Sequence, residues 1–334
     1  MTFEARVAAV VAQKFTERQA RFLVTVMLHS GVCMTRQYCA FAKMVYGQTA
    51  RDFFARLVAH QLATATDGLH KRARIFHIHH RALYEAIGEP HSRFRKPTPI
   101  GRAVERLMLL DAVLSTHDLT WLATERDKLA HFILLLGTQL RREELPHLVF
   151  GQNGKTTVRH FPDKFPIGQD PDGRVHVFVY LVTRPAPVDF RAFLHRHAEL
   201  LRALPRWTVR LVIPPHLAKA AEAYVGAGHQ ELASPLRPAI VDELRWFFER
   251  QRTSPEGVSE TSTLDAARYE QARLAFNAPR FRALYRAWLR EGSRALDATI
   301  SPVLADAIHR GTGRFECHVL PRAYLHLSPL VSTA

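Results

Sequence analysis

Cysteine is scarce in this sequence, and long apolar runs are missing from it. The 334 residues contain three cysteines, too few for a disulfide scaffold and typical of a reducing compartment. The strongest apolar stretches, Phe132–Leu136 and Val175–Val182, are far shorter than the roughly 18 residues that a membrane span needs. The N-terminal apolar run is short and carries Glu4, unlike a signal peptide. We therefore expect a cytoplasmic protein with no membrane partner.

Common catalytic and cofactor-binding motifs are also missing. The sequence has no GxxxxGK[S/T], GxGxxG or GxSxG pattern, so it shows no sign of a P-loop, a dinucleotide site or a serine-hydrolase elbow. His77 and His79 would share one face of a strand, but no set of cysteines or carboxylates accompanies them. We expect no metal, no cofactor and no catalytic residue.

Positive charge is in large excess. Lys and Arg number 46 against 31 Asp and Glu, a formal net charge of +15. The first 110 residues hold 17 Lys and Arg against 7 Asp and Glu, so two thirds of the excess lies in one third of the chain. Such a surplus indicates a polyanionic partner, most often nucleic acid. We expect the site for that partner in the first third of the chain.

Two polar stretches divide the chain. His91–Pro99 carries two prolines and Arg252–Thr263 has almost nothing to bury, as is typical of linkers. The expected fold is an α+β structure in three parts: residues 1–96, 97–250 and 251–334. The last part is expected to be helical from Leu264 to about Leu296, with aromatic residues at helical spacing beside arginines. It would serve as a core, a dimer surface or a second DNA contact.

The first part has the element order of a winged helix-turn-helix domain. Thr16 has capping-box spacing and starts one helix, and helices Arg36–Lys43 and Ala50–His60 follow. Two β-like stretches, Gln61–Thr66 and Ala73–His79, then enclose a turn. In domains of this type the second helix of the motif, here Ala50–His60, enters the major groove of duplex DNA.

That helix, the hairpin tip and the linker would supply the DNA contacts. Polar side chains on the helix would reach base edges, and the cationic wing and linker would hold phosphates. The predicted DNA-binding residues are Arg36, Gln48, Thr49, Arg51, Asp52, Arg56, His60, His70, Lys71, Arg72, Arg74, Arg93, Arg95 and Lys96. The competing interpretation is a solvated hairpin in a domain used for protein contacts.

The middle part has the order α-β-β-β-α-β. A strand, helix and strand of this length favour a parallel pair of strands. The order is that of the PD-(D/E)xK nuclease core. The expected elements are helices Pro99–Leu114 and Thr124–Leu136, strands His147–Phe150, Thr156–Phe161 and Val175–Thr183, helix Val188–Leu204 and strand Thr208–Ile213.

Nuclease chemistry of that type needs two acids and a lysine around a divalent metal. Pro162-Asp163 stands at the end of the second expected strand, where the first acid belongs, but Phe178–Val182 in the third strand has neither acid nor lysine. The expected domain is therefore nuclease-like and catalytically degenerate. A displaced active site stays open as an alternative, with Asp163 joined by one further acid: Asp170, Asp172 or Glu199.

Several short motifs together resemble the replication-relaxation family of bacterial plasmid and mobile-element proteins. They lie at Phe15–Gln19, Thr35–Gln37, Trp121–Arg126, Pro162-Asp163 and Val177–Val182, and the resemblance covers about residues 15–213. It implies a winged-helix DNA-binding domain joined to a nuclease-like domain, and a role in plasmid replication or DNA relaxation. The family's third strand ends with acidic residues, where this chain has Tyr180 and Val182.

A sequence-specific double-stranded DNA-binding protein accounts for these observations. We expect a transcriptional regulator, or a replication or mobilisation factor of a plasmid or mobile element, associated with the nucleoid. A homodimer is expected because winged-helix regulators commonly bind paired half-sites, and the α/β or C-terminal part is expected to dimerise or bind a protein. Two alternatives stay open: a metal-dependent nuclease, and an interaction scaffold whose basic face meets an acidic protein or membrane.

Overall fold

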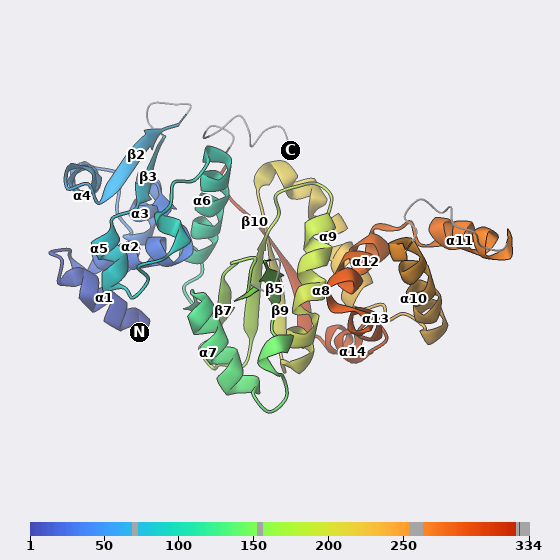
Figure 1. Cartoon of the computed structure of the whole chain (residues 1–334). Coiled ribbons are helices and arrows are strands. Elements are labelled where there is room, and N and C mark those ends of the chain that lie inside the picture. Colours follow the sequence, from blue (N-terminus) through green and yellow to red (C-terminus); the bar gives the residue numbers. More distant parts are fainter. Residues whose placement is uncertain (69–72, 152–155, 254–262, 325–326, 328–334) are drawn as a thin grey trace.

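The computed structural model describes residues 1–68, 73–151, 156–253, 263–324 and 327. It is an α+β structure in which an N-terminal body, a central mixed sheet and a C-terminal group of helices follow one another (Figure 1). Among the described residues, no helix has both the length and the apolar character needed to cross a membrane.

The N-terminal body packs helices around three short antiparallel strands in the order β1-β3-β2. The expected helices and hairpin are present, with ends within two residues of the predicted ones for the second and third helices and both strands. Three elements of this body, α1, β1 and α5, were not predicted from the sequence. The elements are α1 (Phe3–Val11), α2 (Glu17–His29), β1 (Val32–Cys33), α3 (Thr35–Phe41), α4 (Gln48–Ala59), β2 (Ala63–Asp67), β3 (Arg74–Ile78) and α5 (Arg81–Ala86).

A capping box and an aromatic core fix the helices of this body. Thr16 Oγ1 accepts a hydrogen bond from the Gln19 backbone N–H, and Gln19 Oε1 accepts one from the Thr16 backbone N–H, so two of the backbone donors at the start of α2 that lack a partner within the helix are satisfied. The rings of Tyr38 in α3 and Phe53 in α4 are 4.6 Å apart between centroids, and Phe22 in α2 lies 5.1 Å from Tyr38. These contacts hold α4 with its polar face outward.

The stretch His91–Pro99 is packed on the N-terminal body. It contains the short 3-10 helix η1 (Arg93–Arg95), and the backbone carbonyl of Phe94 lies 2.8 Å from His77 Nε2. Gly31, which follows α2, has φ +73°, and a Cβ there would stand 2.6 Å from the Phe94 carbonyl oxygen. Glycine at this position therefore allows the two backbones to meet, and the expected linker becomes part of the body.

The central sheet has five described strands in the order β10-β9-β8-β7-β4, in which β10 (Gly313–Val319) comes from the C-terminal end of the described chain. β8 and β9 are parallel, as predicted, with His176 opposite Trp207, and β7 and β4 are antiparallel to their neighbours. The elements of this region are α6 (Ile100–Leu114), β4 (Thr120–Leu122), α7 (Glu125–Leu136), β5 (His147–Phe150), β6 (Thr157–His160), β7 (Ile167–Gln169), β8 (His176–Leu181), α8 (Val188–Ala203) and β9 (Trp207–Ile213).

The prediction for the first two strands of this sheet was wrong. The stretches His147–Phe150 and Thr156–Phe161 form a separate hairpin of β5 and β6, and the antiparallel half of the sheet comes from β4 and β7. These two strands have only three residues each, too few to show an alternating apolar pattern. The sequences of β5 and β6 look more like strands than those of β4 and β7, although most residues of β5 and β6 are exposed or half-buried.

The C-terminal region is helical as predicted, but it ends in a strand of the central sheet. β10 pairs with β9 along its whole length, and α12 packs on α8. Arg314, Glu316 and His318 alternate in β10, so this edge strand has no apolar run. Most of the expected linker Arg252–Thr263 lies outside the described residues. The elements are α9 (Ala221–Leu232), α10 (Pro238–Thr253), α11 (Thr263–Ala275), α12 (Pro279–Glu291), α13 (Ser293–Asp297), α14 (Val303–His309) and β10 (Gly313–Val319).

Helix α6 joins the N-terminal body to the sheet, and Figure 1 shows it between the two. One apolar cluster contains Ile75 of the body, Val104 and Leu107 of α6, and Val179 and Leu181 of β8. A larger cluster covers the other face of the sheet with α7, α8 and α9. The two parts therefore share a core, which fixes their relative position.

Candidate nucleic-acid interface

An open groove of about 1150 Å³ lies between α4 and the β2–β3 hairpin. Its floor is largely apolar, and three of the predicted DNA-binding arginines line it: Arg36, Arg51 and Arg74. Tyr46, in the turn before α4, lines the groove with 62% of its surface exposed, and Val58 is 39% exposed. Tyr46 was not among the residues predicted from the sequence, because an aromatic residue between two helices is more commonly part of a core.

The outer face of α4 is polar and open to solvent. Five predicted residues on this helix and at its end are exposed: Gln48, Thr49, Arg51, Asp52 and His60. Gln48 Nε2 donates a hydrogen bond to Asp52 Oδ1 at 2.5 Å. Arg51 has no ion pair or hydrogen bond with any residue of the described chain, so its guanidinium group is available to an external anion.

Two predicted contact residues have intramolecular partners instead. Arg36 donates two hydrogen bonds to Asp111 of α6, at 3.0 and 2.7 Å. Arg56 Nη2 donates to Gln19 Oε1 at 2.9 Å, and its guanidinium lies 4.9 Å from the centroid of the Phe15 ring. Both arginines therefore stabilise contacts between helices, which a linear sequence cannot reveal.

Arg74 has an exposed partner. Its Nε donates to Asp67 Oδ1 at 2.9 Å across the hairpin, and both side chains are about 60% exposed. An ion pair this open contributes at most about 1 kcal/mol, so a phosphate can compete for the arginine. The neighbouring tip residues, predicted to hold phosphates, lie outside the described residues: His70, Lys71 and Arg72.

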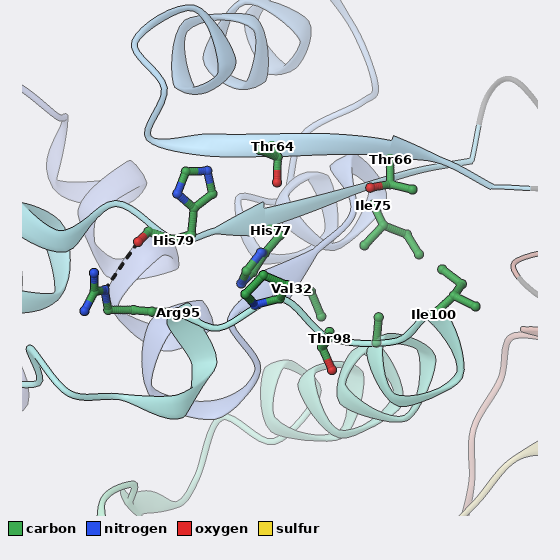
Figure 2. Close-up of a pocket in the computed structure, with 11 residues that line it drawn as sticks. Val32, Thr64, Thr66, Ile75, His77, His79, Arg95, Thr98 and Ile100 are labelled. Carbon is green, nitrogen blue, oxygen red and sulfur yellow. Dashed lines mark hydrogen bonds between the residues drawn. The ribbon is translucent and has the colours of Figure 1, made fainter.

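The linker cations are not on the groove. Arg95 Nη1 donates to the Pro90 carbonyl at 2.6 Å and its Nε to the His79 carbonyl at 3.4 Å. It lines a hollow of about 610 Å³ on the opposite face of the hairpin from the groove. Ile75 and His77 of β3 line the hollow and Arg74 and Phe76 line the groove, because alternate residues of a strand point to opposite sides. Figure 2 shows Arg95 at one end of this hollow and Ile75 and Ile100 at the other. Lys96 is exposed, and Arg93 lines a separate cavity.

His77 and His79 do not assemble a metal site in the described chain. Their ring centroids are 5.7 Å apart, and His77 Nε2 is already 2.8 Å from the Phe94 carbonyl oxygen. Burial lowers the pKa of both rings, which keeps them neutral. Across the described residues, no three His, Cys, Asp or Glu side chains are grouped as a metal ion would need.

The acids proposed for a displaced nuclease site are separated. Asp163 lies before β7 and accepts a hydrogen bond from Arg196 Nη1 of α8 at 2.6 Å. Asp170 and Asp172 lie beyond the other end of β7, where Asp170 accepts from the backbone N–H of the turn. Glu199 is paired with its own arginine, Arg202.

One lysine does approach Asp163 from elsewhere in the chain. Lys128 of α7 is buried and its Nζ donates to the Phe165 carbonyl at 2.7 Å. Burial lowers its pKa to about 7, while the charge of Asp163 acts to raise it. Tyr180, at the position of the missing acid, is buried among aromatic rings. One acid paired with an arginine and one lysine do not provide the two carboxylates that hold the metal.

No family model matches the sequence, and no match was found among curated proteins or solved structures. The likeness to replication-relaxation proteins is therefore a prediction from short motifs.

Proposed function

We propose that this protein binds double-stranded DNA sequence-specifically through a winged-helix domain formed by residues 1–96. The exposed polar face of α4, beside an open groove with free or exchangeable arginines, carries the proposal. The order α2, β1, α3, α4, β2, β3 and the sheet order β1-β3-β2 support it, because α4 then has the place of a recognition helix and the hairpin that of a wing.

The proposed contact set is smaller than the one predicted from sequence. Residues of α4 and its end would read base edges in the major groove, while Arg74 and the hairpin tip would lie against phosphates. Arg36, Arg56 and Arg95 are left out because their guanidinium groups are held within the protein. Arg93 and Lys96 are left out because neither lines the groove. The retained residues are Gln48, Thr49, Arg51, Asp52, His60, Arg74 and, at the tip, His70, Lys71 and Arg72.

The middle region is proposed to be a nuclease-like domain without hydrolytic activity. The order α6, β4, β7, β8, α8, β9 again gives α-β-β-β-α-β once the whole segment between β4 and β7, helix α7 and the β5–β6 hairpin, is treated as an insertion. The pairing of Asp163 with Arg196 occupies the one acid at the expected position. We infer a role that needs no hydrolysis, as a regulator or as a replication or mobilisation factor acting at the nucleoid.

A homodimer is the proposed DNA-bound state. Exposed apolar side chains in the last turn of α7 support it, since Leu134 is 89% exposed and Ile133 and Leu135 are each 43% exposed. Light scattering on the full chain, compared with a Leu134→Glu variant, measures the mass directly. A monomer at all concentrations would refute this part of the proposal.

Selection of bound fragments from random duplex DNA tests the main proposal. We expect one enriched motif, and fluorescence anisotropy on it should show that Arg51→Gln weakens binding by about 5- to 150-fold, the range for losing one base contact. Arg81→Gln is the matched control, because Arg81 is 69% exposed on α5, pairs with Glu85 and lies outside the groove. Absence of enrichment, or equal losses in the two variants, would refute specific recognition by α4.

The nuclease alternative has its own test. Supercoiled plasmid is incubated with the wild-type protein and with Asp163→Asn, with Mg²⁺ or Mn²⁺ present. We expect no nicking by either protein. Metal-dependent nicking that Asp163→Asn abolishes would establish the alternative function.

A further inference from the structure

A second cavity, of about 600 Å³, lies at the junction of the N-terminal body, α6 and the carboxyl end of β8. None of its lining residues lines the DNA groove. Its cationic lining comes from four parts of the chain: Arg93 in η1, Arg102 and Arg106 in α6, Lys164 before β7, and Arg184 after β8. Three carboxylates also line it: Glu105, Asp163 and Asp189.

Each of these carboxylates already has an arginine partner. The pairs are Arg102 with Glu105 at 2.8 Å, Arg184 with Asp189 at 3.7 Å, and Arg196 with Asp163. In the described chain this leaves three lining cations with no carboxylate at ion-pair distance: Arg93, Arg106 and Lys164. The cavity therefore has a local excess of positive charge that the protein does not neutralise.

Phe94 holds two of these cations close together. The guanidinium carbon of Arg93 lies 5.2 Å from the centroid of the Phe94 ring, and that of Arg106 lies 5.1 Å from the same centroid. Arg106 Nη1 is buried and has no hydrogen-bond acceptor in the described structure. A buried donor without an acceptor is unfavourable, so this group lacks a partner that a ligand could supply.

The three charges also disfavour one another. Desolvation, followed by the charges of Arg106 and Arg102, lowers the pKa of Arg93 to about 10. Desolvation, followed by the charges of Arg93 and Arg159, lowers the pKa of Lys164 to about 8. An anion placed between these groups would offset both effects and raise both pKa values.

We propose that this cavity binds a small phosphorylated ligand, with its phosphoryl group held by Arg93, Arg106 and Lys164. Planar guanidinium groups donate paired hydrogen bonds to phosphate oxygens, and lysine adds a point charge. The volume is in the range of small-ligand sites. The position, outside the carboxyl end of a strand that is parallel to its neighbour and near the start of α8, is where α/β sheets bind anionic ligands.

Isothermal titration calorimetry of the full chain with pyrophosphate tests this proposal. We expect saturable binding to one site, weakened at least about tenfold in Arg106→Gln and in Lys164→Gln, as for loss of a charged hydrogen bond. Arg81→Gln removes one positive charge from the same body outside the cavity and should bind as the wild type does. Repeating the titration near pH 8 in two buffers should show a more positive net proton uptake for the wild type than for Lys164→Gln, because bound pyrophosphate raises the pKa of Lys164.

Three results would overturn the proposal. One is the absence of saturable binding, and another is an equal loss of affinity in Arg81→Gln, which indicates unspecific attraction. The third concerns duplex DNA, with which the same variants are titrated. We expect Arg106→Gln and Lys164→Gln to bind duplex DNA with an affinity within about twofold of the wild-type affinity. If duplex affinity falls by the same factor as pyrophosphate affinity, the cavity holds a nucleic-acid phosphate instead of a small ligand. Circular dichroism shows whether Arg106→Gln and Lys164→Gln are folded. If one of them is not, the pyrophosphate and DNA affinities of the other variant test the proposal.

Discussion

Replacing Arg36 with Gln tests whether this arginine contacts DNA or holds α3 to α6. Its two hydrogen bonds to Asp111 are part of a larger group, in which Gln37 Nε2 donates to Asp111 Oδ1 at 2.9 Å and the Tyr324 hydroxyl donates to Oδ2. One carboxylate thus joins α3, α6 and the segment that follows β10. The structure predicts that the variant loses stability while DNA binding is retained.

The size of the loss follows from the exposure of the pair. The side chains of Arg36 and Asp111 are 24% and 16% exposed, so this ion pair is intermediate between an exposed and a buried one. An exposed pair contributes up to about 1 kcal/mol, and disruption of a buried pair costs about 3–5 kcal/mol. Asp111 also keeps two other donors when Arg36 is removed. We expect a loss of about 2 kcal/mol, or a decrease of Tm on the order of 5 °C.

Urea denaturation followed by circular dichroism measures the free energy of unfolding, and anisotropy on the selected duplex measures DNA affinity. Arg51→Gln is the opposite case. Arg51 is exposed and has no partner among the described residues, so the variant should change stability by less than about 0.5 kcal/mol, and under the proposed function it should weaken DNA binding. The structural assignment of Arg36 is refuted if Arg36→Gln keeps wild-type stability and loses as much DNA affinity as Arg51→Gln.

Two further predictions concern stability. Replacing Gly31 (φ +73°) with Ala should cost about 1–3 kcal/mol, whereas Gly226→Ala in α9, where a Cβ meets nothing within 4 Å, should be neutral or stabilising; equal Tm values would contradict this. Acidification from pH 6.5 to 4 should lower the urea midpoint, because the unfolded state binds more protons than the folded state in this range; a constant midpoint would exclude it. The loss of stability at acidic pH comes from three buried histidines. Desolvation is the main cause that lowers the pKa of His29 to about 3 and the pKa values of His176 and His197 to about 4.

Local signals explain why most helices and the hairpin could be predicted. The capping box at Thr16, the apolar run Val175–Val182 and the strand–helix–strand spacing around α8 are each contained in a short stretch of chain. β4, β7 and β10 show no such signal. They are short or polar, and hydrogen bonds to strands distant in the sequence stabilise them, so only the assembled sheet identifies them.

Some features of the candidate interface could likewise be predicted from a short stretch of sequence, and others depend on contacts between distant residues. The exposure of Arg51 and Gln48 follows from the spacing of Phe53, Phe54 and Leu57, which fixes the buried face of α4. The partners of Arg36 and Arg95 could not be predicted, because Asp111 lies 75 positions away from Arg36 and the backbone carbonyls that Arg95 meets depend on how the linker packs.

By itself the sequence determined the α+β class, the parallel β8–β9 pair, the outer face of α4 and the concentration of positive charge in the first third of the chain. Each of these depends on periodicity or composition, which residues carry with them into any fold. Only the tertiary structure decided which cations are free and which are paired, and that three of them meet at one cavity. The sequence shows only that an arginine is positively charged. Its role depends on whether folding brings a carboxylate, a carbonyl or another cation to within a few ångströms of its guanidinium group.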